Sequence, residues 1–426
     1  MDIIYFYIIY KRKMKNNINC ILGEYKHNKV KIIILSKKTY DIRLNINSNI
    51  SKERFINIEK YKVNDVIIEN MKEGNIYNIS FINKKNNKII LYLNINLKEN
   101  PFNNVKIVNC DSNFGLETNT WNLINNKFGV IFHIGDFLYN DLIFRKYYDN
   151  IIKNNIDYDS IKQTIYEELY DNYIECIDRK KYYLMNNFNY IMTDDHETID
   201  DIYYNDNKNN KNFIKIYNLF KKVEINIFNN LKFRNIEIDF ITDCANKTVY
   251  VMNYKNMIIN NHLINKYNIY DNIKNYNNIF FLERKCFSSS KPTLLSSIIF
   301  KEKEINRDND NFYKFLNKIY YNKNINIISG DYHIISSMDI YDKKFDYKIC
   351  SVKNVGAINT CVDIFGANLF IDSKYYDSRN KEIIYKNGYI YIYHKNNKIN
   401  IKNMINSKTN MIFNVINNII TAIKFL

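Results

Sequence analysis

Glycine and proline are scarce in this sequence. The chain has 9 glycines and 2 prolines among its 426 residues, where average usage would supply about 50 of the two together. Asparagine, isoleucine, lysine and tyrosine take their place, a composition typical of an AT-rich genome. The net charge of +16 would otherwise favour a polyanionic partner. Because the lysines are scattered and form no block, we attribute most of the excess to codon usage, and nucleic acid is not indicated as a partner.

Paired cysteines and long apolar runs are also absent. The seven cysteines form no CxxC pair, and an odd, dispersed set argues against a disulfide framework and indicates the cytoplasm or another reducing compartment. Residues 1–10 are apolar, but no basic residue precedes them and no small-residue cleavage site follows. We therefore expect no signal peptide. No stretch of 18 uninterrupted apolar residues occurs, so we expect no membrane span.

The composition nevertheless supports a folded chain of two or three domains. Hydrophobic residues make up 46% and aromatic residues 15%, which excludes wholesale disorder, and the length exceeds what one core usually holds. Period-2 patterns predict short strands in the first hundred residues, with a turn at Gly74. The predicted strands there are 30–35, 40–46 and 89–95, and residues 66–81 are predicted to form two strands on either side of that turn. We expect residues 1–103 to form a small all-β sandwich domain that ends near Pro101, which cannot continue a ladder.

Strands and helices alternate in the rest of the chain. Apolar residues four apart predict a helix over 159–186. Short buried-type strands are predicted at 105–108, 129–134, 190–192 and 325–328. The pattern indicates a layered α/β domain over 104–403. An Asn/Lys/Asp tract at 203–212 is typical of a flexible loop, and residues 404–426 predict a C-terminal amphipathic helix.

Four polar motifs directly follow predicted strands. They are Cys110-Asp111-Ser112-Asn113, Gly135-Asp136-Phe137-Leu138-Tyr139-Asn140-Asp141, Asp194-Asp195-His196-Glu197 and Gly330-Asp331-Tyr332-His333. Two of the nine glycines precede a strand-end aspartate, where a glycine allows a sharp turn that directs the carboxylate toward an ion. Several carboxylates in one place need a cation to relieve their repulsion, and hard cations bind oxygen and imidazole ligands.

These motifs, in this order, resemble those of the PhoD-like alkaline phosphatase family of the calcineurin-like metallophosphatase superfamily. That family writes its later motifs as Gly-Asp-x-x-Tyr-x-Asp, Asp-Asp-His-Glu and Ser-Gly-Asp-x-His, as this chain does at 135–141, 194–197 and 329–333. A β-sandwich with a turn like 72–77 precedes its catalytic domain. The resemblance covers most of residues 60–395. It implies a metallophosphatase-type αββα sandwich and hydrolysis of a phosphate mono- or diester by a metal-activated water.

The resemblance also implies a site of two metal ions, from among Fe, Ca, Mn and Zn. Asp136 corresponds to the carboxylate that bridges them. Asp111 or its neighbour Cys110, together with His333, corresponds to the ligands of the first ion. The second ion would be held by Asp195 and Asp331.

Catalytic roles follow from the same resemblance. His196 would act as general acid or donate a hydrogen bond to the phosphoryl oxygens, and Glu197 would orient His196. Tyr139 and Asp141 would shape the pocket. His133 lies inside an apolar run, and we expect it in the core.

The sequence departs from the family at two points. The family follows a later strand with Asp-x-Arg, whereas residues 241–246 keep Asp243 and offer no arginine, and Asn113 replaces a common ligand histidine. The alternative function is therefore a metal-binding, catalytically weak or inactive relative that serves as a structural or binding protein. A nucleic-acid-binding protein ranks last.

Overall fold

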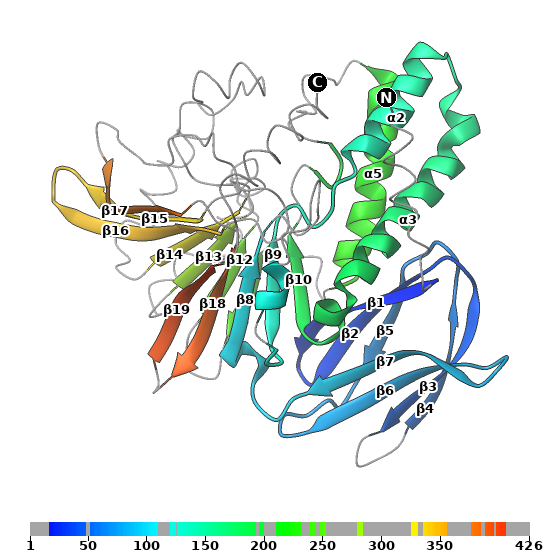
Figure 1. The fold of residues 1–426 in the computed structure, drawn as a ribbon, viewed down its shortest axis with the longest axis horizontal. Helices are drawn as coiled ribbons and strands as arrows, with labels where there is room; N and C mark the ends of the chain where they lie inside the picture. The colour runs from blue at the N-terminus through cyan, green and yellow to red at the C-terminus, as the bar shows by residue number, and fades with distance from the viewer. Residues whose placement is uncertain are drawn as a thin grey trace. The chain divides into compact units, whose positions relative to one another are not determined.

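The structure is a computed structural model, and it forms two compact units built from interleaved segments (Figure 1). It describes residues 17–47, 52–109, 120–124, 126–192, 196–199, 210–231, 238–242, 248–252, 279–283, 325–330, 335–355, 376–384, 388–395 and 398–405. Unit 1 comprises Met1–Glu99, Leu142–Asn189 and Asn207–Phe233, and unit 2 comprises Asn100–Asp141, Tyr190–Asp206 and Arg234–Leu426. The predicted limits 1–103, 104–403 and 404–426 stay predictions.

Unit 1 contains the predicted β-sandwich. One antiparallel sheet has the order β1-β2-β5 and the other the order β4-β3-β6-β7. The strands are β1 (Ile18–Lys26), β2 (Lys29–Ser36), β3 (Tyr40–Asn47), β4 (Lys52–Ile58), β5 (Asn64–Ile68), β6 (Ile76–Asn83) and β7 (Lys88–Asn96). The alternating residues Tyr77, Ile79 and Phe81 of β6 are buried, because successive side chains of a strand point to opposite faces. Gly74 precedes β6 with φ +87°, which confirms the expected turn.

Three helices belong largely to the same unit, namely α2 (Asp141–Lys153), α3 (Tyr158–Met185) and α5 (Lys211–Asn229). The helix predicted at 159–186 is α3. Its predicted stripe is Ile161, Ile165, Leu169, Tyr173 and Ile177, of which the last four are buried and Ile161, near the start of the helix, is half-buried. Helix α5 begins after Asn210, whose side chain accepts a hydrogen bond from the amide of Phe213 and so caps the helix.

The predicted loop at 203–212 is wrong for its last two residues, which are helical. Residues 211–212 open α5, while 203–209 lie outside the described residues. The cap at Asn210 is the physical reason, since it satisfies an amide of the first helical turn.

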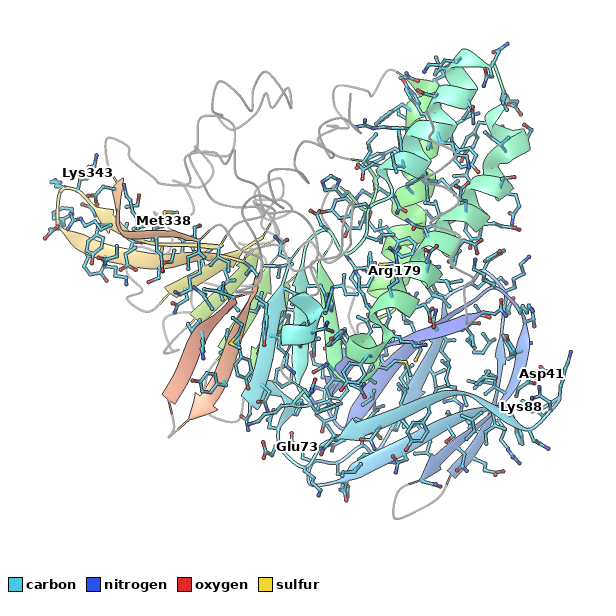
Figure 2. All side chains as sticks on the ribbon, in the orientation of Figure 1. Asp41, Glu73, Lys88, Arg179, Met338 and Lys343 are labelled. Atoms are coloured by element: carbon cyan, nitrogen blue, oxygen red, sulfur yellow. The ribbon has the colours of Figure 1, made fainter. Side chains whose placement is uncertain are left out.

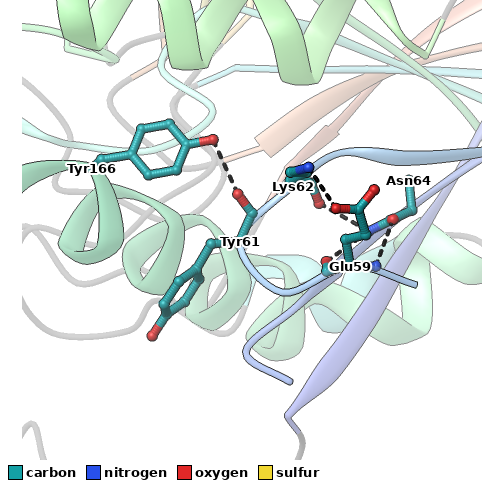
Figure 3. Close-up of polar contacts among 5 residues, drawn as sticks. All are labelled: Glu59, Tyr61, Lys62, Asn64 and Tyr166. Atoms are coloured by element: carbon teal, nitrogen blue, oxygen red, sulfur yellow. Dashed lines mark hydrogen bonds and ion pairs between the residues drawn. The ribbon is translucent and has the colours of Figure 1, made fainter. Parts of the chain in front are cut away.

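A short loop of the sandwich is bonded to helix α3 (Figure 3). Tyr61 adopts φ +51°, and its carbonyl accepts a hydrogen bond from the Tyr166 hydroxyl at 3.0 Å. Asn64 closes the loop internally by donating to the carbonyl of Glu59 at 3.1 Å. Burial, and then Asp171, raises the pKa of Tyr61 to about 12. The sandwich and the helices are therefore held by specific polar contacts as well as by apolar packing.

Unit 2 carries two mixed sheets, as a layered α/β domain requires. The five-stranded sheet has the order β10-β9-β8-β18-β19, and the seven-stranded sheet the order β11-β12-β13-β14-β16-β15-β17. The strands of the first are β8 (Asn104–Val108), β9 (Val130–Ile134), β10 (Phe188–Met192), β18 (Gly388–Lys395) and β19 (Lys398–Ile405). Strands β8 and β9 are parallel, and β14, β13 and β16 are parallel neighbours in the second sheet.

In the seven-stranded sheet, a long hairpin leads from β15 through a turn at Lys343 into β16 (Figure 2), and β17 pairs with the outer side of β15. Its strands are β11 (Ile238–Thr242), β12 (Thr248–Met252), β13 (Ile279–Glu283), β14 (Ile325–Ser329), β15 (Ile335–Asp342), β16 (Tyr347–Asn354) and β17 (Tyr376–Ile384). Met404 and Ile405 complete β19, so the segment predicted as a C-terminal helix begins two residues inside a strand. Its residues 406–426 lie outside the described part of the chain.

Candidate functional site

The ends of β8, β9 and β14 meet at Gly330. A Cβ atom built on Gly330 would lie 2.4 Å from the carbonyl oxygen of Ile134, the last residue of β9, and 2.6 Å from Oδ1 of Asn109, which directly follows β8. Only a residue without a side chain fits there. Its φ lies outside the left-handed region, so close packing is the reason that this position needs a glycine. The expected turn toward Asp331 stays a prediction, because the residues that follow Gly330 lie outside the described part of the chain. Asn109, Ile134 and Gly330, which directly precede or open three of the four motifs in the sequence, therefore lie beside one another.

Gly135 and Asp136 make the sharp turn that the sequence predicted after β9. Their φ angles are +115° and +51°. A left-handed conformation is uncommon for a residue with a side chain, and aspartate tolerates it better than most. Asp136 is buried, with 1% of its surface exposed. The turn thus holds a carboxylate at the strand end in a backbone conformation that the surroundings must enforce.

Three hydrogen bonds join the loop after Asp136 to the turn that contains the third motif. The backbone amide of Phe137 donates to Oε1 of Glu197 at 2.6 Å. The amide of Asn140 donates to the carbonyl oxygen of His196 at 2.8 Å, and the Asn140 side chain donates to the carbonyl oxygen of Glu197 at 2.6 Å. Since the Glu197 side chain is fully buried, these bonds fix the loop against the turn.

His196 lies between two side chains of that loop. Its Nδ1 is 3.0 Å from Oδ2 of Asp141, a fully buried carboxylate at the first residue of α2. Its ring packs against the ring of Tyr139, with 4.3 Å between centroids, and the Tyr139 hydroxyl donates to Oδ2 of Asp136 at 3.4 Å. Asp136, Tyr139, His196 and Asp141 therefore form one contiguous polar cluster.

Two solved structures share the architecture that carries this cluster. The structure of PhoD matches with a TM-score of 0.57 and 10% identity, over 88% of this chain and 83% of that one. A purple acid phosphatase, PPD1 from yellow lupin (Lupinus luteus) seeds, matches with a TM-score of 0.57 and 10% identity, over 93% and 73%. The chain has a PhoD-like fold. The α/β metallophosphatase fold with an additional all-β domain, expected from the motifs, is thereby confirmed.

Sequence comparisons add nothing to this likeness. No family model matches the chain, and no curated protein does. At 10% identity the likeness to the solved structures concerns the fold. Within the described ranges, no helix is long and apolar enough to cross a membrane.

The PhoD-like fold brings together some of the predicted site residues. Asp136, His196 and Glu197 lie in the bonded loop and turn. The other predicted ligands, Cys110, Asp111, Asp195, Asp331 and His333, lie outside the described residues. Among the residues that are described, no group of three histidine, cysteine, aspartate or glutamate side chains could hold a metal ion. The metal ligand set stays a prediction.

Asp136 nonetheless fits such a site. It is a buried carboxylate held at a strand end, two residues after Ile134, whose carbonyl oxygen packs against Gly330. The carboxylate oxygens of Asp136 are suitable ligands for the hard cations that the other predicted ligand residues would also bind.

Two residues have a larger place in the structure than the sequence indicated. Asp141, expected only to shape the pocket, contacts His196. Asn109 was not singled out at all, although its side chain lies at the junction with Gly330 and donates to the carbonyl oxygen of Val355 at 3.3 Å. The Gly-Asp-x-x-Tyr-x-Asp pattern was the signal for Asp141. Asn109 gave none, because asparagine is abundant throughout this sequence.

Proposed function

We propose that this protein is a metal-dependent phosphoesterase that hydrolyses a phosphate mono- or diester by attack of a metal-activated water at a dinuclear site. The observation that carries the proposal is the bonded pair of segments at 135–141 and 196–197, which holds an aspartate and a histidine at the strand ends of a PhoD-like fold. Both similar structures support it, because one is of PhoD and the other of a purple acid phosphatase. The substrate would be a phosphate ester.

The proposed metal ligands share a position just after a strand of unit 2. They are Cys110 or Asp111, Asp136, Asp195, Asp331 and His333. Carboxylate and imidazole ligands suit Fe, Mn, Zn or Ca. Bound metal would lower the pKa of a water and stabilise charge on the phosphoryl oxygens.

Within this proposal the described residues position and transfer a proton. With Nδ1 of His196 facing Asp141, Nε2 is the nitrogen that can donate to the leaving group or to a phosphoryl oxygen. The Asp141 carboxylate fixes the ring orientation and stabilises the imidazolium form. Glu197 holds the amide of Phe137, next to Asp136. The role predicted for Glu197, orienting His196, remains a proposal beside the contact that Asp141 makes.

The site is also proposed to work in a reducing compartment such as the cytoplasm. Cys20 and Cys350 are buried free thiols, as expected for a chain without a disulfide framework.

Elemental analysis combined with turnover of generic esters tests the proposal. The purified chain should contain two metal ions and hydrolyse p-nitrophenyl phosphate or bis-p-nitrophenyl phosphate when Mn²⁺, Fe²⁺, Zn²⁺ or Ca²⁺ is supplied. Asp136→Asn should lower both metal content and turnover, whereas Asp65→Asn, a change on β5 of the other unit, should alter neither. Bound metal without turnover of any ester would exclude the enzyme and leave the metal-binding relative. A chain that binds no metal would refute both.

A further inference from the structure

Three segments of the β-sandwich in unit 1 meet at one end of it, and lysine is abundant in all three. The amide of Tyr61 donates to the carbonyl oxygen of Ser36 at 2.8 Å, and the amide of Lys84 donates to that of Asp41 at 2.9 Å. We call the segments joined in this way, residues 36–41, 59–63 and 84–88, the basic end. Its lysines are Lys37, Lys38, Lys60, Lys62, Lys84, Lys85 and Lys88, and its carboxylates are Asp41 and Glu59.

The opposite end of the sandwich is balanced in charge. Its turns at 27–29, 69–75 and 97–99 are joined by the bonds from Met71 to Asn28 and from Gly74 to Leu97. They contain one carboxylate for each lysine, namely Lys29, Lys72 and Lys98 with Glu69, Glu73 and Glu99. Figure 2 shows Glu73 at this end and Asp41 and Lys88 at the basic end. The lysine excess of the sandwich turns therefore lies at one end.

Most lysines of the basic end have no carboxylate partner. Lys37 pairs with Asp171 at 2.7 Å, and Lys62 pairs with Glu59 at 2.5 Å. The others are exposed, and within the described ranges they form no ion pair: Lys38, Lys60, Lys84, Lys85 and Lys88. Several like charges held close together attract an anionic partner.

Large apolar side chains are exposed beside these lysines. Phe55 of β4 is 62% exposed and Ile89 of β7 is 60% exposed. They belong to one row across the outer face of the four-stranded sheet, in which each residue pairs with the next: Phe55, Arg43, Ile82 and Ile89. The Lys84 ammonium lies 4.7 Å from the centroid of the Phe55 ring. The apolar row and the basic end therefore form one continuous surface.

We propose that this surface docks the protein on an anionic membrane, with the lysines at the lipid headgroups and Phe55 and Ile89 inserted below them. Exposed apolar side chains beside several lysines are the chemistry of peripheral membrane binding. The cytoplasmic leaflet carries anionic lipids, which agrees with the compartment proposed above. The inference does not rest on the phosphoesterase proposal.

A nucleic acid is less favoured as the partner. Proteins that bind single strands offer several open aromatic rings on which bases stack. Phe55 is the one aromatic residue of the row, and the Lys84 ammonium lies over its ring. An anionic membrane requires no such stacking surface, because it is bound through charge and through burial of apolar side chains.

The first experiment sediments the full chain with vesicles of phosphatidylcholine alone or mixed with an equal amount of phosphatidylserine. Wild type should sediment with the mixed vesicles only, and added salt should weaken binding. The test variant combines Lys84→Gln, Lys85→Gln and Lys88→Gln. It should bind about 100-fold more weakly, because each lysine near an anionic surface contributes about fivefold.

A matched variant removes the same charge from the opposite end. It combines Lys29→Gln, Lys72→Gln and Lys98→Gln. It should bind like wild type at physiological salt, where charges act over about 8 Å. Melting temperatures of both variants should equal that of wild type, since all six lysines are exposed.

The second experiment tests insertion with Phe55→Trp and, as its control, Phe345→Trp. Phe345 is 64% exposed and also has a lysine, Lys344, over its ring at 4.9 Å. It differs because its turn balances two lysines with Asp342 and Asp346. Brominated phosphatidylcholine in the mixed vesicles should quench the tryptophan at position 55 and leave that at position 345 unchanged. Phe55→Ser should weaken binding about tenfold, since one large apolar side chain is no longer buried.

Three results would overturn the inference. The first is a wild-type chain that does not sediment with the mixed vesicles, or sediments equally with phosphatidylcholine alone. The second is an equal loss of binding in the two lysine variants, which would mean that net charge alone is responsible. The third is an unquenched tryptophan at position 55 together with tighter binding of single-stranded DNA through the same three lysines, which would identify a nucleic-acid site. None of these results would affect the phosphoesterase proposal.

Discussion

Replacing Lys106 by methionine should remove a steep pH dependence from the stability of unit 2. Lys106 lies in β8, between Tyr391 of β18 and Ile131 of β9, and none of its surface is exposed. Its ammonium group donates to the carbonyl oxygen of Lys127 at 2.5 Å. Burial lowers the pKa of Lys106 from 10.5 to about 7, because the charged form loses its hydration in the interior.

The sign of the effect follows from proton counts. Between the two pKa values the unfolded chain keeps the proton on Lys106 and the folded chain releases it, so stability rises with pH. Each unit of pKa shift corresponds to about 1.4 kcal/mol. From about pH 8 to about pH 10, wild type should gain about 2–3 kcal/mol relative to Lys106→Met. Loss of the hydrogen bond to Lys127 lowers the free energy of unfolding of Lys106→Met by an amount that changes little with pH. The difference between the two proteins in how steeply this free energy rises with pH therefore reports the titration of Lys106.

The free energy of unfolding at each pH is measured by urea denaturation, with tryptophan fluorescence as the signal. Trp121 is the single tryptophan, it is buried, and it belongs to the same unit as Lys106. Lys88→Met, on the exposed start of β7 (Figure 2), is the control and should follow the wild-type slope. Parallel stability curves for wild type and Lys106→Met would refute the reasoning, because they would mean that Lys106 stays protonated when folded.

Three further outcomes are expected. Asp136→Asn should lower metal content measured by elemental analysis, because a neutral amide cannot offset two cations; full metal content would exclude a bridging role. His196→Ala should reduce kcat by about 10²–10⁴-fold with metal content unchanged, and the loss should be smaller for p-nitrophenyl phosphate than for an alkyl phosphate; equal losses would contradict proton donation to the leaving group. The Cys20 thiol, whose pKa burial raises to about 12, should resist iodoacetamide in the folded chain at pH 8 and react after denaturation, as mass spectrometry would show; rapid labelling of the native chain would disprove its burial.

Local patterns in the sequence were sufficient for the strands that carry the motifs and for helix α3. Runs such as Val130–Ile134 contain only buried residues, and a helix of 28 residues shows its period over many turns. The turn at Gly135 could be anticipated because glycine tolerates the left-handed conformation found there. The same signal at Gly330 reflects close packing instead, a distinction that the sequence alone could not make.

Features set by distant pairing could not be predicted in this way. The contact of Asn109 joins residues 246 apart in sequence. Strand β15 has serines and aspartates among its apolar residues, and it is held by neighbours on both sides rather than by its own pattern. Helix α5 was missed because its start lies next to an asparagine-rich tract, where one capping asparagine cannot be distinguished from the others.

The order of the segments along the chain has a consequence for synthesis on the ribosome. Unit 1 has all its segments once Phe233 has been made, so it can fold while the rest is still being translated. Strand β8 is different, because its antiparallel neighbour is β18, at Gly388–Lys395. Until those residues emerge, β8 presents an open edge that other chains can pair with. A nascent chain arrested before β18 would therefore combine a finished unit 1 with an aggregation-prone strand beside the incipient site, and this interval is when the protein would most need a chaperone.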